Sequence, residues 1–538
     1  MALLSVTVPR VSQVVVASIV VLGIYAVALA IYRLFFHPLA KYPGRLQYKL
    51  SSWPLVYQAY TGDRHIWHLK DHEKYGPVVR IAPNTLSFNT ASALHTIYGA
   101  RNANVKKAGF YKTVDVAAGA YSSFTETDRE KHAAKRRWMG PVFSADSVKQ
   151  NEAAIVDVVE QFCETLRPGG TETGTGQWGP KWNASELTTY LGFDIMGSLI
   201  FGHDFQSVQR SEHRDLADSI LPTFRFLNWV SHLPMAVLIR PFMRTRLFEM
   251  AGGKPVADNN RLIDYASREV EARIANTDSS EKEATAGRLD FLSRLVQLED
   301  KRTGWRPTPA DLNTECLNMM NAGADPYSGV IAGAIFYLVH NADVLQKATA
   351  EVRATFSSTS DIHNGPALNS CTYLYACIEE TLRRTAPVPS HLPRAVLAGG
   401  LSIDGHDVPA RTEVGVSTYA LHHEARYFED PWVFKPERWI ESAANPPERI
   451  AHARKAFAPF QLGSRQCSGK HLAYLQLKLT LAHVLWRFEL RVAPGEMGRG
   501  AGGKGLGVGR ERVDEFQLWD AFGFARDGPM VEVRDAHY

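Results

Sequence analysis

The N-terminal segment from Val11 to Tyr32 limits what this chain can fold into, because it is uncharged and mostly Val, Ile, Leu and Ala. As a helix that rises about 1.5 Å per residue, it is long enough to span the hydrocarbon core of a bilayer. A cleaved signal sequence is the alternative, but its apolar part is usually shorter and ends at a small-residue cleavage site. A border typical of membrane interfaces follows instead: Tyr32-Arg33-Leu34-Phe35-Phe36. The sequence therefore predicts a membrane anchor over residues 1–32.

Basic residues are distributed unevenly around this segment. Only Arg10 precedes it, whereas several follow closely: Arg33, Lys41, Arg45 and Lys49. The positive-inside rule then places the rest of the chain in the cytosol. Residues 33–50 contain two prolines, which cannot continue a helix, so we expect a stiff elbow between the anchor and a folded body over residues 51–538.

The overall composition argues against two classes of protein. The 60 basic and 56 acidic residues leave a net charge of only +4, which gives no reason to expect binding to nucleic acid. The five cysteines are odd in number and show no paired spacing. They argue against a disulfide scaffold and for a reducing compartment.

Hydrophobic periodicity predicts a mainly α-helical body with a minor β-sheet portion. The longest periodic stretch, Asp311 to His340, has small and apolar residues throughout and should form a buried helix. The other predicted elements are two helices, Tyr373–Thr385 and His471–Phe488, and four strands: Val78–Ile81, Ser87–Phe88, Leu401–Ile403 and Met530–Val533. Two glycine-rich segments without apolar period are expected to be surface loops: Pro168–Lys181 and Gly495–Gly509.

Cys467 lies in the segment Phe460-Gln461-Leu462-Gly463-Ser464-Arg465-Gln466-Cys467-Ser468-Gly469. This segment resembles the haem-binding signature of the cytochrome P-450 family, Phe-x-x-Gly-x-Arg-x-Cys-x-Gly, at every fixed position. The resemblance implies that Cys467 binds the haem iron as an axial thiolate, which favours O–O cleavage. Gly463 would allow a sharp turn and Gly469 a close approach to the porphyrin, while Arg465 would pair with a haem propionate. A lone structural cysteine is the alternative.

Two further segments resemble motifs of the same family. Glu380-Thr381-Leu382-Arg383 resembles its Glu-x-x-Arg element, and Pro436-Glu437-Arg438-Trp439 resembles its Pro-Glu-Arg-Phe element, with Trp in place of Phe. Residues at i and i+3 of a helix are neighbours, so an ion pair between Glu380 and Arg383 is geometrically natural. The resemblance implies a buried structural network of Glu380, Arg383 and Arg438 behind the haem, where an unpaired charge would be costly.

Three more residues are candidates for holding the haem propionates. His132-Ala133-Ala134-Lys135-Arg136 resembles the family's Trp-x-x-x-Arg element, and His132 keeps an N–H donor in place of the commoner Trp. His132 and Arg136 share a helix face. Arg394 occupies a strand position that usually provides another propionate ligand in the family. A solvated basic helix is the alternative for His132 and Arg136.

The long predicted helix departs from the family pattern beside the oxygen site. The family usually has Ala/Gly-Gly-x-Asp/Glu-Thr there, whereas this chain has Ala322-Gly323-Ala324-Asp325-Pro326. Proline has no hydroxyl to help deliver protons and no N–H to bond the carbonyl of Ala322. One hypothesis is that Asp325, an ordered water and a polar group of the substrate carry the protons. The second is a peroxide-driven enzyme, or an isomerase or dehydratase, and the third is that Pro326 only shapes the pocket.

Substrate contacts in the family come from the loop before the basic helix, the long helix and the strand after Glu-x-x-Arg. The corresponding candidates here are Phe110, Tyr121, Phe124, Asn321, Val388 and His391. They describe an apolar, aromatic pocket with a few polar groups, as most small-molecule sites have. We therefore expect a lipophilic substrate, which would enter from the membrane past the apolar, proline-containing segment Phe226–Met243.

The resemblance covers nearly the whole chain and implies a single, mainly helical catalytic domain with haem b as its cofactor. The segment Tyr32 to Leu39 looks like that of filamentous-fungal members, which implies oxidation in secondary metabolism at the endoplasmic reticulum membrane. NADPH and flavins would act through a separate NADPH–cytochrome P-450 reductase, with cytochrome b5 as a second candidate partner. An acidic partner would be steered by basic residues on one face: Lys131, Lys135, Arg137, Arg454, Lys455 and Lys470.

Overall fold

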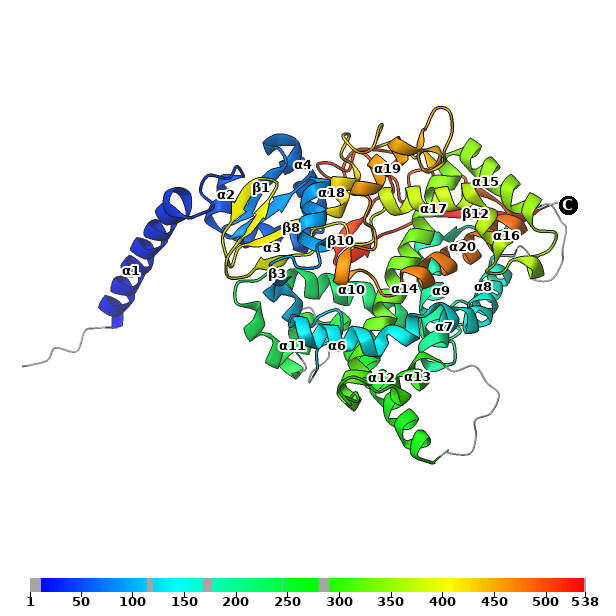
Figure 1. The fold of residues 1–538 in the computed structure, drawn as a ribbon, viewed down its shortest axis with the longest axis horizontal. Coiled ribbons are helices and arrows are strands. Elements are labelled where there is room, and N and C mark those ends of the chain that lie inside the picture. The colour runs from blue at the N-terminus through cyan, green and yellow to red at the C-terminus, as the bar shows by residue number, and fades with distance from the viewer. Residues whose placement is uncertain (1–10, 114–119, 168–176, 244, 280–289, 537–538) are drawn as a thin grey trace, which may run out of the picture.

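The computed structural model describes residues 11–113, 120–167, 177–243, 245–279 and 290–536, which form an apolar helix attached to a mainly helical body (Figure 1). Helix α1 (Val11–Ile31) continues into a π-helical turn, Tyr32–Phe36. Together they give one exposed apolar helix over Ser12–Phe36, 25 residues long and therefore sufficient to cross a membrane. The helix extends past the predicted end at residue 32 because no proline interrupts the chain before Pro38.

The connection between this helix and the body packs against the first strand. The fully buried Arg80 donates hydrogen bonds from its side chain to the carbonyl oxygens of Arg33 (2.9 Å) and Pro83 (2.7 Å). Its backbone N–H donates to the carbonyl of Pro43, 2.7 Å away. These contacts fix the segment predicted to be an elbow, which ends in the short helix α2 (Leu46–Leu50).

The body is built mainly from helices, as predicted. The long helix α14 (Pro309–His340) runs through it and packs along α9 (Ala184–Phe201). The two other predicted helices are α17 (Thr372–Arg384) and α20 (Lys470–Arg487). The remaining helices are α3 (Trp53–Thr61), α4 (Arg64–Tyr75), α5 (Ala91–Leu94), α6 (Arg129–Met139), α7 (Ala145–Gln150), α8 (Glu152–Leu166), α10 (Arg214–Ser231), α11 (Arg246–Gly252), α12 (Lys254–Ser279), α13 (Phe291–Gln297), α15 (Ala342–Thr355), α16 (Pro366–Ser370), α18 (Thr418–His422) and α19 (Pro447–Ala456).

The largest sheet lies at the end of the body that carries α1 (Figure 1). Its five strands have the order β1 (Val78–Ala82), β2 (Thr85–Phe88), β8 (Glu413–Val416), β5 (Arg394–Val396), β3 (Val105–Lys107). The pair β2–β8 is parallel and the others are antiparallel. The other strands are β4 (Trp182–Asn183), β12 (Met530–Asp535) and β9 (Phe488–Val492) in one sheet, and the hairpins β6 (Leu401–Ile403)–β7 (His406–Val408) and β10 (Trp519–Ala521)–β11 (Gly523–Ala525). All four predicted strands are present.

Local sequence explains where α14 begins and how it packs. Thr308 caps its N-terminus in a capping box, and Pro309 occupies the first turn, where a missing N–H costs nothing. Gly192 of α9 lies so close that a Cβ there would be 2.4 Å from the hydroxyl oxygen of Ser328. The helix continues through Pro326.

The two predicted loops have different outcomes. Residues 495–509 contain turns and irregular backbone without a helix or strand, and most of them are exposed or half-buried, as expected. Residues 168–176, which make up most of the other loop, lie outside the described residues.

Candidate functional site

Cys467 lies in a tight loop between the 3-10 turn η9 (Gly463–Arg465) and the first residue of α20. Its backbone N–H donates to the carbonyl of Phe460, 2.9 Å away, which closes the loop. Gly463 has a φ of 70°, and a Cβ there would lie 2.2 Å from the carbonyl oxygen of Tyr98. A side chain at position 463 would therefore be strained and would collide with its neighbour.

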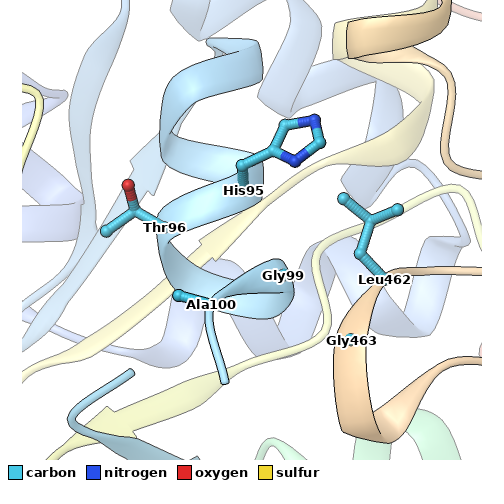
Figure 2. A pocket seen from close by; sticks show the side chains of 6 residues that line it. All are labelled: His95, Thr96, Gly99, Ala100, Leu462 and Gly463. Atoms are coloured by element: carbon cyan, nitrogen blue, oxygen red, sulfur yellow. The ribbon is translucent and has the colours of Figure 1, made fainter. Parts of the chain in front are cut away.

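The outer side of this loop borders a shallow hollow of the surface. Figure 2 shows Leu462 and Gly463 facing the turn that carries His95 and Gly99. The imidazole of His95 is within hydrogen-bonding distance (3.0 Å) of the carbonyl oxygen of Lys455. The glycine-dependent contact of Gly463 with Tyr98 thus fixes the cysteine loop against the N-terminal part of the body.

The thiol of Cys467 differs from the other four, because Cys467 is exposed and the others are buried. Desolvation by the surrounding protein raises the pKa of this thiol, but the backbone N–H of Gly469 and the charges of Arg136 and Lys470 act in the opposite direction. Arg136 also donates to the hydroxyl of Ser468, next to the cysteine. The sulfur is accessible, and the donors and cations around it partly offset the cost of a thiolate.

Five basic residues from four segments of the chain converge beside this loop. Strands β3 and β5 pair Lys107 with Arg394, α6 contributes His132 and Arg136, and η9 contributes Arg465. Burial and the charge of Arg465 lower the pKa of His132 to about 2. Burial and the charge of Arg394 lower the pKa of Arg465 to about 10. Burial, Arg465 and Arg394 hold the pKa of Lys107 well below its ordinary range.

This cluster has the composition of a site for a dianionic group. The strongest charges acting on Lys107 come from three arginines and one carboxylate, Glu315. Two carboxylates of a ligand, such as the propionates of haem, would relieve that repulsion and accept charge-assisted hydrogen bonds. The accessible thiol of Cys467 adds the one ligand that haem iron requires from a thiolate protein. The residues present therefore fit a haem group.

The predicted charge network is assembled around Glu380, whose side chain is fully buried. Arg383 binds it through two N–H groups (2.8 and 3.0 Å), and Arg438 lies at 3.1 Å. Burial acts to raise the pKa of Glu380, but the two arginines outweigh it and hold the pKa at about 2. The indole N–H of Trp439 also donates to Glu380 at 3.0 Å, which the family's commoner Phe cannot do.

The part of α14 that carries the family's oxygen-site pattern presents a narrow accessible face. Ala322 is exposed and Pro326 is partly exposed within an otherwise largely buried stretch. Asn318, also half-exposed, lies one turn earlier on the same side. Gly323 instead packs against Met196 of α9, where a Cβ would lie 2.5 Å from the sulfur. Asn318 was missed from sequence because nothing distinguishes it from other polar residues of the helix.

Asp325 points into a buried ion pair with Arg526, which follows β11. Its carboxylate lies 2.7 Å from the guanidinium, and the side chains of Asp325 and Arg526 are 9% and 2% exposed. Arg526 also donates to the hydroxyl of Thr189 on α9, at 3.2 Å. A Cβ at Gly523 would lie 2.4 Å from the Asp325 carboxylate, so the pair needs glycine there. No sequence pattern indicates Arg526, because the two residues lie 201 positions apart.

The hydroxyl groups of Tyr327 and Ser328, which follow Pro326, already form hydrogen bonds with other groups. The Tyr327 hydroxyl bonds with that of Thr480 on α20, at 2.5 Å. The Ser328 hydroxyl donates to the carbonyl of Ala324, at 2.6 Å. Both side chains are buried. Neither hydroxyl replaces the one that is missing at position 326.

An aromatic cluster brings together two of the predicted substrate contacts. The rings of Phe110 and Phe124 lie 5.8 and 5.1 Å from that of Phe522, which is at the tip of the β10–β11 hairpin. Tyr111 packs against both of them. Phe522 has a φ of 77°, a strained conformation for a bulky residue of the kind found at functional sites. It was missed because a single phenylalanine in a short loop carries no pattern.

The other substrate candidates occupy varied surroundings. Asn321 is buried, and its side-chain oxygen has no partner among the described residues. Tyr121 and Val388 are half-buried. His391 is buried against His68, with ring centroids 5.0 Å apart, and lies over Gly415. The structure thus brings Phe110 and Phe124 into one aromatic cluster, whereas Asn321, Tyr121, Val388 and His391 lie in different surroundings.

Comparison with known proteins agrees with this site. The family model for cytochrome P-450 matches residues 50–507. Cytochrome P-450 monooxygenase fscF from Fusarium equiseti is 36% identical over 95% of each chain, and monooxygenase AKT7 from Alternaria alternata is 36% identical over 96% of this chain and 97% of that one. The crystal structure of a cytochrome P-450DA haem domain has the same fold, with a TM-score of 0.69 at 16% identity over 92% of this chain and 98% of that chain. This chain belongs to the cytochrome P-450 family, whose members bind haem through a cysteine thiolate, and it is a monooxygenase.

Proposed function

We propose that this monooxygenase holds haem b through the Cys467 thiolate and oxidises a lipophilic small molecule in fungal secondary metabolism. The observation that carries the proposal is the single accessible thiol next to five converging basic residues. Lys107, His132, Arg136, Arg394 and Arg465 would hold the propionates. The haem iron, when bound, supplies the oxygen chemistry. The accessible residues of α14, Ala322 and Pro326, border the space where a substrate would react.

A membrane location is supported by apolar side chains on the surface near α1. Trp53 and Tyr57 of α3 are exposed, as are residues of α11 and the segment before it: Met235, Leu238, Phe242, Leu247 and Met250. Helix α3 contacts α10, with the rings of Tyr60 and Trp229 6.0 Å apart, and α10 in turn contacts the turn Ala236–Leu238 of the second region, so α10 connects the two regions. Exposed apolar patches of this kind mark membrane or partner contacts. We place them at the endoplasmic reticulum membrane, with residues 1–32 as the anchor, 33–50 as the elbow and 51–538 as a cytosolic catalytic domain.

Electrons would come from NADPH through a separate cytochrome P-450 reductase, with cytochrome b5 as a second candidate. Lys131, Lys455 and Lys470 are exposed and remain suited to steer an acidic partner. Lys135, expected on the same face, is instead buried and ion-paired with Asp311 at 2.7 Å, because it faces α14 rather than solvent. Lys135 is therefore excluded from the proposed docking surface.

The experiment compares product formation by the purified, haem-loaded protein under two conditions. One uses the reductase with NADPH, and the other uses hydrogen peroxide alone, with fungal extracts as substrate and mass spectrometry as readout. A product that depends on reductase and NADPH supports the proposal. A product formed equally well by peroxide alone would contradict it.

A second candidate, a peroxide-driven enzyme, isomerase or dehydratase, is favoured by one observation. Pro326 removes the usual hydroxyl, and Tyr327 and Ser328 do not restore it. In the leading proposal Asp325, which Arg526 holds in place, acts with an ordered water and a polar group of the substrate to carry the protons. Pro326→Thr tests the difference through product formed per NADPH consumed. Unchanged coupling would show that the missing hydroxyl does not limit oxygen use and that Pro326 only shapes the pocket.

A further inference from the structure

The segment Ser122–Glu126 forms a compact turn that precedes α6. The backbone N–H groups of Thr125 and Glu126 donate to the carbonyl of Ser122, at 3.1 and 2.8 Å. The N–H of Ser122 donates back to the Thr125 hydroxyl at 2.9 Å. Four of the five residues are buried, whereas Phe124 is only partly buried. Phe124 therefore projects from a turn that is held together by its own hydrogen bonds.

Glu315 of α14 holds this turn from one side. Its side chain is fully buried and accepts two hydrogen bonds from Ser123, one from the backbone N–H (2.5 Å) and one from the hydroxyl (2.9 Å). The ammonium group of Lys135 lies 3.7 Å away and balances its charge. Hydrogen bonds to a buried carboxylate are among the stronger ones, and both would be lost together if the turn moved.

The basic cluster holds the turn from the other side. Lys107 donates to the carbonyl of Phe124, and Arg465 donates to the carbonyl of Glu126 at 2.8 Å. The ammonium group of Lys107 also lies 4.9 Å from the centre of the Phe124 ring. Phe124 is thus fixed between α14 and the residues proposed to bind the haem propionates.

Phe124 also contacts the aromatic cluster of Phe110, Tyr111 and Phe522. Its ring lies 5.1 Å from Phe522 and 5.4 Å from Tyr111. Glu315 lies on the same side of α14 as Asn318 and Ala322, at spacings of three and seven residues. A change in the Ser123–Glu315 contact would therefore change how far the Phe124 ring extends toward that side of the helix.

We propose that the Ser123–Glu315 pair is a latch that fixes Phe124 as a size-selecting side chain of the substrate space. Glu315 and Ser123 are positioning residues, and Phe124 makes the contact with the ligand. The proposal rests on the haem-thiolate function proposed above and adds a determinant of substrate size. Opening the latch admits bulkier ligands and leaves small ones unaffected.

The test uses two azoles of different size as probes on the purified ferric haem protein. Imidazole and clotrimazole both ligate haem iron, and their dissociation constants follow from absorption titrations. In Phe124→Ala, the ratio of the clotrimazole constant to the imidazole constant should fall about tenfold, the scale on which pocket size discriminates ligands. Ser123→Ala and Glu315→Gln should shift the ratio in the same direction. The matched control is Ser185→Ala, which removes a buried serine hydrogen bond to the Gly528 carbonyl and should leave the ratio unchanged.

Either of two results of the azole titrations would overturn the proposal. A ratio that changes in Phe124→Ala but not in Ser123→Ala or Glu315→Gln shows that the pair does not position Phe124. A ratio that changes in none of them shows that Phe124 does not select for size. A merely structural effect would lower the melting temperature without changing the ratio.

Hydrogen exchange distinguishes failure of the latch from failure of the proposed function. The amide of Ser123 should exchange faster in Glu315→Gln than in the unaltered protein, whether or not haem is thiolate-bound. Equal exchange overturns the latch. Absence of azole binding in the unaltered protein, with faster exchange in Glu315→Gln, would instead count against the haem function and against size selection, while leaving the contact itself intact.

Discussion

The cysteine loop and the Pro326 turn of α14 differ in how their polar groups are satisfied. Around Cys467, burial and neighbouring positive charges lower the pKa values of Lys107, His132 and Arg465, so an anionic ligand would stabilise this cluster. Around Pro326, Asp325 is paired with Arg526 and Tyr327 with Thr480. The first region is suited to bind an anionic group, whereas in the second region the ion pair and the hydroxyl pair stabilise the helix next to its accessible face. Substitutions in the two regions should therefore differ in whether they affect haem binding or only the stability of the fold.

The largest effect is expected at Glu380, behind the cysteine loop. Glu380→Gln leaves two buried arginines uncompensated and should lower the free energy of unfolding by about 3–5 kcal/mol. Urea unfolding measures this loss. Glu437→Gln is the control, because its ion pair with Lys347 is exposed and should contribute less than about 1 kcal/mol. Equal losses in the two variants would contradict the network.

The same residue predicts an acid dependence of stability. Its pKa is about 2 in the folded protein against 4.5 ordinarily, so its contribution is complete above pH 4.5 and is lost as the pH falls toward 2. Glu380→Gln should remove this part of the dependence. Unfolding measured at pH 3 and pH 7 in both proteins tests the sign.

The Asp325–Arg526 pair should show the next largest effect and should leave haem binding intact. Asp325→Asn and Arg526→Gln each leave a buried partner unpaired and should cost about 3 kcal/mol of stability. Because both changes act on one contact, the double variant should lose less than the sum, by at least about 1 kcal/mol. Strictly additive losses would show that the two side chains act independently.

Substitution of Lys107 should weaken haem binding and leave the Asp325–Arg526 region unchanged. Lys107→Met removes one charge-assisted contact and should weaken haem binding by about 2 kcal/mol. Transfer of haem to an excess of apomyoglobin measures the loss. Burial lowers the pKa of Lys107 in the haem-free protein, so below the ordinary value of 10.5 the unfolded chain binds more protons than the folded chain. The free energy of unfolding of the haem-free protein should therefore fall as the pH drops below 10.5. This dependence should be weaker in Lys107→Met, and an unchanged dependence would contradict the assignment.

The smallest effect is expected for Trp439→Phe, which substitutes the residue more common in the family. It removes the indole hydrogen bond to Glu380 and should lower stability by about 1.5 kcal/mol. The thermal unfolding midpoint reports the change. A stability equal to that of the unaltered protein would mean that the two arginines and the Lys435 N–H satisfy Glu380 without it.

The sequence predicted the parts of the molecule that depend on local pattern. The long helix at Asp311–His340, the strands at residues 78–81 and 530–533, and the Glu380–Arg383 pair follow from periodicity or from spacing on one helix. The motif around Cys467 also placed Arg465 beside the other basic groups.

Residues that depend on long-range packing could not be predicted in this way. Lys107 belongs to the basic cluster only because β3 pairs with β5, and the adjacent Lys106 is exposed. Arg526 and Phe522 reach the site from the C-terminal hairpin, and no periodicity links them to α14. Lys135 looked like a surface residue but faces Asp311.

The absorption spectrum of the reduced protein with carbon monoxide tests the central claim, that Cys467 ligates haem, most directly. The unaltered protein should show the band characteristic of thiolate-ligated haem, and Cys467→Ala should lose it. Cys163→Ala is the control, since Cys163 is buried in the core and should leave the band in place. Retention of the thiolate band in Cys467→Ala would contradict the account.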